Sequence, residues 1–161
     1  MSLTAKAQAD LIQVKDRMIA LLRETPEDRV NWKPSPSARS ILEIVAHSGH
    51  ALHNIAQQLR GIPFAAPSSA DANKAFLDHD AQFTTADEVA AYLEEQCAAY
   101  IQLLASFTQE DLDRRVRLPF GLGKAPIGFF MTMGHIHTLG HVAQIEYVQT
   151  LYGDQLWHTG F

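Results

Sequence analysis

The segment PIGFFMTMGHIHTLGHVAQIEYVQTLYG, residues 126–153, decides the fold because it is one long helical pattern that carries histidines on its apolar face. At about 100° per residue, a helix over this segment aligns seven side chains on one stripe: Phe130, Gly134, His137, His141, Ile145, Val148 and Tyr152. His135 points about 160° away from His137 and falls on the other side. The stripe therefore predicts a core-facing helix with His137 and His141 one turn apart.

This histidine pair has two interpretations. A neutral imidazole has one donor and one acceptor nitrogen, so two core histidines satisfied by hydrogen bonds would explain the pattern. The spacing of four residues also brings two ring nitrogens close enough to hold one divalent cation from a single helix face. The spacing alone leaves both interpretations open, and a third ligand elsewhere would favour the metal.

Composition narrows the class of protein. The 161 residues predict a single domain spanning 1–161, with 47% hydrophobic and 19% charged residues typical of a globular chain. A net charge of −5 argues against nucleic acid as a partner, and the sequence has no apolar run long enough for a membrane span. The lone Cys97 cannot form an internal disulfide and no signal peptide is recognisable, so we expect a cytoplasmic protein.

Three further segments have helical periodicity. They cover residues 4–23, 40–61 and 85–107, and the last two begin with the capping-box pairs Ser40 with Glu43 and Thr85 with Glu88. The connection 62–84 is long, with a short helical possibility at 70–78, as a crossover between parallel helices of a bundle requires. The sequence thus predicts an all-α four-helix bundle with a long crossover between its second and third helices.

The second helix supplies the candidate third ligand. His47 lies at the edge of the apolar stripe of this helix, whereas His50 and His53 fall on the opposite half, which we expect to be solvated. His50 is one turn from His47 and would replace it if the helix were rotated. His79 in the crossover is expected to be exposed. Cys97 lies on the apolar stripe of the third helix, where an inert core thiol is expected.

Residues 108–124 precede the last helix and predict a short capped turn and a hairpin-like excursion. Arg114, Arg115 and Arg117 give this region the densest positive charge in the chain. They could hold an anionic substrate by bidentate contacts, although such clusters are usually solvated and paired with nearby acids such as Asp111 and Asp113.

Several of these segments also match a known family. WKPSPS and ARSILEIVAHSGH in and before the second helix, and HIHTLGHVAQIEYVQTLYG in the last, resemble the DinB/YfiT-like family of bacterial four-helix metalloproteins. The resemblance covers nearly the whole chain. It implies that His47, His137 and His141 hold one divalent metal ion, with nickel, zinc and iron all suited to imidazole. Three histidine ligands leave open coordination positions, as in catalytic metal sites.

The resemblance also implies a range of functions and a homodimer. The first hypothesis is a metal-dependent transferase or isomerase that activates a low-molecular-weight thiol toward a small electrophile. The alternatives are a non-catalytic metal-binding dimeric protein of stress response, and a metal-dependent hydrolase. A roomy pocket over the metal would favour an enzyme, whereas a site plugged by Phe129, Phe130 or Trp157 would not. Apolar residues outside the inner stripe, namely Phe129, Met131 and Tyr147, also favour a homodimer.

Overall fold

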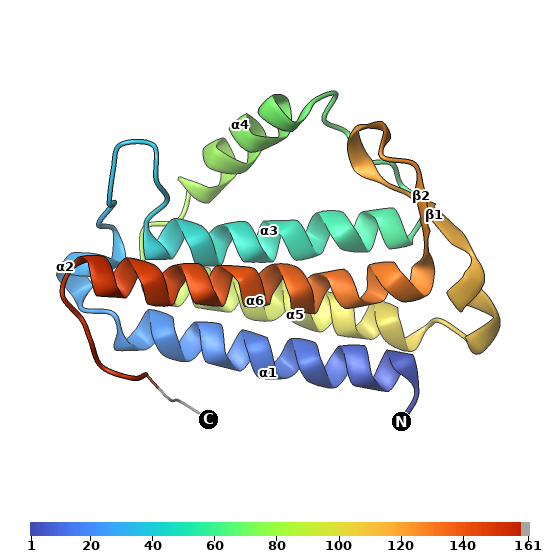
Figure 1. The fold of residues 1–161 in the computed structure, drawn as a ribbon, viewed down its shortest axis with the longest axis horizontal. Helices are drawn as coiled ribbons and strands as arrows, with labels where there is room; N and C mark the ends of the chain where they lie inside the picture. The colour runs from blue at the N-terminus through green and yellow to red at the C-terminus, as the bar shows by residue number, and fades with distance from the viewer. Residues whose placement is uncertain (159–161) are drawn as a thin grey trace.

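Four long helices dominate the computed structural model, which describes residues 1–158 (Figure 1). They are α1 (Leu3–Glu24), α3 (Ile41–Leu59), α5 (Ala86–Ala105) and α6 (Ile127–Leu151). None of the helices in this part of the chain combines the length and hydropathy that a membrane span requires. The predicted four-helix bundle is confirmed.

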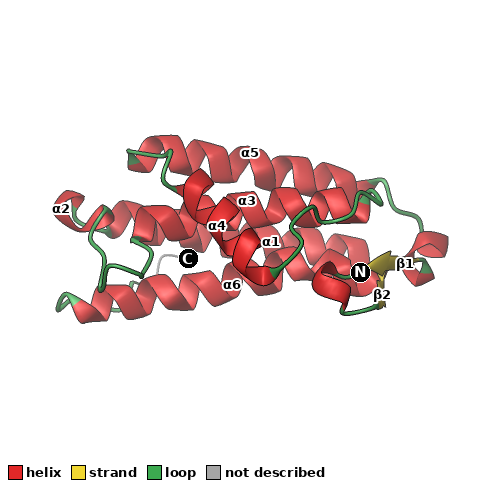
Figure 2. Cartoon of the chain, turned by 90° about the horizontal axis from the view of Figure 1, so that it is seen from above, coloured by secondary structure: helices red, strands yellow, loops and turns green. Residues whose placement is uncertain are grey.

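The order of the helices follows from one long crossover. In Figure 1, α1 and α6 run in one direction and α3 and α5 run in the other. Because α3 and α5 are parallel neighbours, the chain must return along the bundle between them, and α4 (Ser69–Asp80) forms part of this return. Figure 2 shows α4 lying over α3, and this position decides what covers the histidines.

Local sequence fixes where α3 begins. Ser40 Oγ accepts a hydrogen bond from the Glu43 backbone N–H at 3.2 Å, and Glu43 Oε2 accepts one from the Ser40 N–H at 2.9 Å. This predicted capping box satisfies two backbone donors that the first helical turn leaves free. The helix ends before Gly61, whose φ of +86° suits glycine better than other residues.

The remaining elements are short and lie at the ends of the bundle. They are α2 (Glu27–Val30), the 3₁₀ turns η1 (Gln109–Asp113) and η2 (Pro119–Gly121), and the strands β1 (Arg115–Arg117) and β2 (Lys124–Pro126). The two strands pair antiparallel with Val116 opposite Ala125, which confirms the predicted hairpin. The hairpin leads directly into α6 and so sets the position at which the histidine-bearing helix starts.

Tyr100 of α5 is the largest fully buried side chain and reaches across the core to α6. Its hydroxyl lies 3.1 Å from the carbonyl oxygen of Phe130 and 3.3 Å from that of Met131. Gly134 makes this approach possible, because a Cβ there would lie 3.1 Å from the Tyr100 ring and 3.0 Å from Leu52. The contact holds α6 against the core one turn before His137.

Candidate metal centre

Three histidines from two helices converge near the middle of the bundle. His47 projects from α3, and His137 and His141 project from α6, with all three half-buried. The His47 ring lies 5.4 Å from the His137 ring and 4.8 Å from the His141 ring, measured between centroids. One ligand nitrogen from each ring falls within 4.8 Å of the other two. The structure therefore brings together the three residues that the sequence singled out.

The spacing of the nitrogens fits a small cation. The Nε2 atoms of His137 and His141 lie 3.1 Å apart. Two imidazole nitrogens bound tetrahedrally at about 2.0–2.1 Å from one zinc ion would be separated by about 3.3 Å. These two side chains already hold their nitrogens at nearly that separation, and a ring nitrogen of His47 lies within 4.8 Å of both.

Gln144 fixes the proton position on His141. Its Oε1 lies 2.9 Å from His141 Nδ1. Because an amide oxygen only accepts, Nδ1 carries the proton and the Nε2 lone pair faces His137 and His47. Hydrogen bonds of this kind hold metal-binding histidines in the required tautomer and orientation.

Asp80, at the end of α4, lies on the other side of His47. Its Oδ2 is 3.5 Å from His47 Nδ1 and accepts a hydrogen bond from Arg39 Nε at 3.2 Å. The Asp80 side chain is fully buried. A carboxylate on the Nδ1 side of His47 leaves Nε2 for the cluster. Neither Asp80 nor Arg39 was identified from the sequence.

Burial keeps the α6 pair neutral. Desolvation, followed by the neighbouring His141 and His47, lowers the pKa of His137 to about 3. Desolvation also lowers the pKa of His141 to about 4, although its hydrogen bond to Gln144 acts in the opposite direction. Both side chains are therefore unprotonated at neutral pH, which is the state that binds a metal ion.

The other two histidines of α3 have different environments. His53 is exposed, as expected, whereas the expectation of a solvated His50 was wrong. Helix α4 covers His50, whose ring lies 4.0 Å from the His79 ring between centroids. The same contact corrects the expectation for His79, since its side chain is only 27% exposed. His50 therefore does not take the place of His47 beside the α6 pair.

His135 also lies away from the cluster, as its angle on the helix predicted. Its Nδ1 is 3.0 Å from the backbone carbonyl oxygen of Asp10 in α1. Four histidines considered in the sequence analysis were not assigned to the cluster. His53 and His135 lie apart from it, whereas His50 and His79 contact each other in a separate group.

The aromatic side chain that packs against His47 is one that the sequence did not indicate. Phe76 of α4 lies 4.6 Å from the His47 ring and 4.5 Å from the His50 ring. Phe129 is 50% exposed, and Phe130 is buried in the core. Helix α4 therefore covers the His47 side of the cluster.

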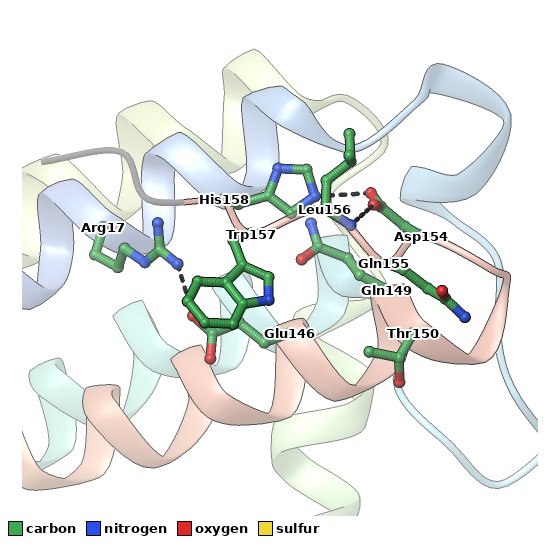
Figure 3. A pocket seen from close by; sticks show the side chains of 9 residues that line it. All are labelled: Arg17, Glu146, Gln149, Thr150, Asp154, Gln155, Leu156, Trp157 and His158. Carbon is green, nitrogen blue, oxygen red and sulfur yellow. Dashed lines mark hydrogen bonds and ion pairs between the residues drawn. The ribbon is translucent and has the colours of Figure 1, made fainter.

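Trp157 borders a different pocket, between α1 and the end of α6 (Figure 3). Its side chain is 90% exposed, near the ion pair in which Arg17 Nη2 lies 2.8 Å from Glu146 Oε1. His158 is held nearby, with Nε2 2.7 Å from Asp154 Oδ2. None of the three clustered histidines lines this pocket, so Trp157 does not plug the candidate metal site.

The three arginines of the hairpin region line a pocket at the far end of α3. Arg60, Lys124 and Gln58 also line it, and the three clustered histidines do not. Gln58 is three turns from His47, about 16 Å along the helix. Arg114 pairs with Asp111 at 3.3 Å, as expected for a solvated cluster. The arginines thus border an opening separate from the histidine cluster.

Cys97 lies on the apolar face of α5 and is 2% exposed. Burial raises the pKa of its thiol to about 11. We expect the native protein to react with a disulfide reagent at pH 8 more than about 100-fold slower than the unfolded chain, because the thiolate is the reacting species. Absorbance of the released chromophore with and without denaturant measures this ratio, and equal rates would contradict the buried position.

Comparisons with known proteins agree on the fold. Residues 10–145 match the family model of the DinB superfamily. The Bacillus subtilis protein YfiT, described as a probable metal-dependent hydrolase with an unusual four-helix bundle topology, aligns with a TM-score of 0.73 at 15% identity, over 93% of this chain and 87% of that one.

Two further solved structures are similar. A DinB-like protein of Bacillus subtilis, YjoA, has a TM-score of 0.65 at 18% identity, covering 94% of this chain and 95% of its own. A putative DinB family member from Exiguobacterium sibiricum has a TM-score of 0.65 at 17% identity, covering 100% and 99%. At these identities the similarity shows the shared fold. A search of curated protein sequences found no match.

Proposed function

This chain belongs to the DinB superfamily, and we propose that it binds one divalent metal ion through His47, His137 and His141 and uses it to activate a small nucleophile. The observation that carries the proposal is the convergence of three ring nitrogens within 4.8 Å of one another. Nickel, zinc and iron are the candidate metals, since all three suit imidazole ligands.

The number of protein ligands supports a reactive site. Three protein ligands leave a coordination position for an exogenous molecule. Gln144 orients the His141 ring through Nδ1, and the buried Asp80 carboxylate lies 3.5 Å from Nδ1 of His47. Phe76 packs an apolar ring against His47 on the α4 side.

The nucleophile we propose first is a low-molecular-weight thiol. The protein would transfer this thiol to a small electrophile, or isomerise the adduct of the two. A bound divalent cation would supply its Lewis acidity, lowering the pKa of a coordinated thiol or water. The chain's single cysteine is buried in the core, so the sulfur would come from a cosubstrate. The description of YfiT as a probable metal-dependent hydrolase favours a second candidate, hydrolysis by activated water.

Metal analysis tests the site directly. Exchanging any one of His47, His137 and His141 for alanine should remove most of the metal from this cluster, because two remaining imidazoles bind weakly. His53→Ala and His135→Ala are matched controls that should leave the metal content unchanged. Elemental analysis of the purified variants measures the result. A metal content as high in all three cluster variants as in wild type would refute the site.

Turnover is tested separately from binding. The fully metallated protein should accelerate the attack of a small thiol on an electrophilic substrate, relative to the free thiol at the same pH. His137→Ala should abolish this rate, and Cys97→Ala should retain it. Ester hydrolysis in the absence of thiol would support the hydrolase instead. No rate in either assay, with metal present, would favour a non-catalytic metal-binding protein of stress response.

We also propose a homodimer through the outer face of α6. Phe129, Ile136 and Tyr147 fall within about 20° of one another on the helix and are 50%, 50% and 64% exposed. Met131, which the sequence had placed with this group, is buried in the core instead. Light scattering at tens of micromolar should report twice the chain mass, and Ile136→Glu should reduce it to the monomer. A monomeric wild-type protein would contradict the proposal.

A further inference from the structure

A second group of metal-binding side chains lies beside the trihistidine cluster and shares none of its residues. It consists of His50 from α3 and His79 and Asp80 from the end of α4. One ligand atom from each falls within 4.8 Å of the other two. The group therefore joins the crossover helix to the bundle at one point.

The polar atoms of this group lack partners. His50 Nδ1, His79 Nδ1 and Asp80 Oδ1 are each buried and make no hydrogen bond within the described structure. His79 Nδ1 and Asp80 Oδ1 lie 3.5 Å apart. A buried polar atom without a partner costs about 1–3 kcal/mol, and more when it is charged. Three unpaired buried atoms in one group of metal-binding side chains indicate a missing ligand.

The charges favour a cation over other ligands. Asp80 has no exposed surface, and Arg39 pairs with its carboxylate through Oδ2 alone, so Oδ1, 3.5 Å from His79 Nδ1, receives no hydrogen bond and remains available to a cation. Aromatic rings surround the group: Phe76 lies 4.5 Å from His50, and Tyr92 lies 5.4 Å from His79. Apolar walls strengthen the attraction between a carboxylate and a cation.

We propose that His50, His79 and Asp80 form a second divalent-cation site. Two imidazoles and one carboxylate are suitable ligands for zinc and for other first-row divalent metals. A cation at this site would give all three unpartnered atoms a binding partner. The inference rests on these contacts and does not depend on the proposed catalytic function.

The position of Asp80 links the two sites. Its Oδ1 faces His79, and its Oδ2 lies 3.5 Å from His47 of the first cluster. A cation on Oδ1 would hold the end of α4 against α3, and with it Phe76 against His47. The second site would therefore secure the helix that packs on one ligand of the first.

Zinc titration of the full chain, after removal of metal with a chelator, tests the proposal. We expect wild type to bind two zinc ions by calorimetry. His50→Gln and His79→Gln should each bind one, since either change removes a ligand while keeping a polar side chain. His53→Gln, one turn from His50 on the same helix but exposed, is the matched control and should bind two.

Variants of the first cluster separate this proposal from the proposed function. His137→Ala should bind one zinc ion, held by the second site. If wild type binds a single ion that His50→Gln and His79→Gln both retain, or if both variants still bind two, the second site is refuted whatever the first cluster does. A second ion that is lost in His53→Gln would be a surface-bound ion, and this result would also overturn the proposal. Circular dichroism confirms that each variant is folded.

Discussion

Replacing Tyr100 with alanine is expected to lower the free energy of unfolding by about 3–5 kcal/mol, the usual range for removing a large aromatic ring from a core. Tyr100 is the largest of the fully buried side chains, and it packs directly against Gly134 of α6. The substitution removes the ring and leaves a cavity between α5 and α6.

Tyr100→Phe is the matched control, because it keeps the ring and removes only the hydroxyl. It leaves the carbonyl oxygens of Phe130 and Met131 without this donor. We expect a loss of about 1–2 kcal/mol, near the contribution of one buried hydrogen bond. Urea unfolding followed by circular dichroism measures both values. An alanine variant as stable as the phenylalanine variant would show that the ring does not fill the core.

The metal-free protein is expected to lose about 2–4 kcal/mol of stability between pH 7 and pH 5, after discounting for partial exposure. This loss of stability comes from three histidines. The pKa values of His50 and His141 are lowered to about 4 and that of His137 to about 3, in each case mainly by desolvation.

The direction follows from the protons bound by each state. An unfolded histidine has a pKa of about 6.5, so below this pH the unfolded chain binds protons that the native state does not. The stabilisation is therefore present above about pH 6.5 and is lost as the pH falls toward the native values of about 3–4. Restricting the measurement to pH 5–7 excludes most carboxylate titration.

Denaturant titrations across this range, in the presence of a chelator, measure the slope. Replacing His137 and His141 together with glutamine should reduce the slope by more than half, since two of the three groups are removed. His53→Gln should leave it unchanged. A stability that does not vary from pH 7 to pH 5 would show that the histidines are solvated in the metal-free protein.

The parts of the structure that the sequence predicted correctly are those governed by local rules. Helical periodicity identified α6, and capping pairs located the starts of α3 and α5. The angular position of His47 also distinguished it from His53, because the direction of a side chain on a helix depends on its residue number alone.

The errors came from packing between elements distant in the sequence. His50 and His79 were expected to be solvated, since the sequence does not specify where α4 lies after a long connection. Asp80 and Phe76 were overlooked for the same reason, although they flank the candidate metal centre. The crossover has no strong apolar periodicity, so its contacts with α3 could be identified only from the structure.

The distribution of the trihistidine cluster along the chain has a consequence for biosynthesis. His47 is made early, but the other two members belong to the last helix, so a nascent chain holds one ligand until residue 137 is translated. The pair in α6 can form within a single helical turn, whereas His47 joins it only after the bundle closes. Metal capture at this cluster would thus wait until α6 has been translated and packed, and a chain truncated before α6 would be unable to retain the cation there.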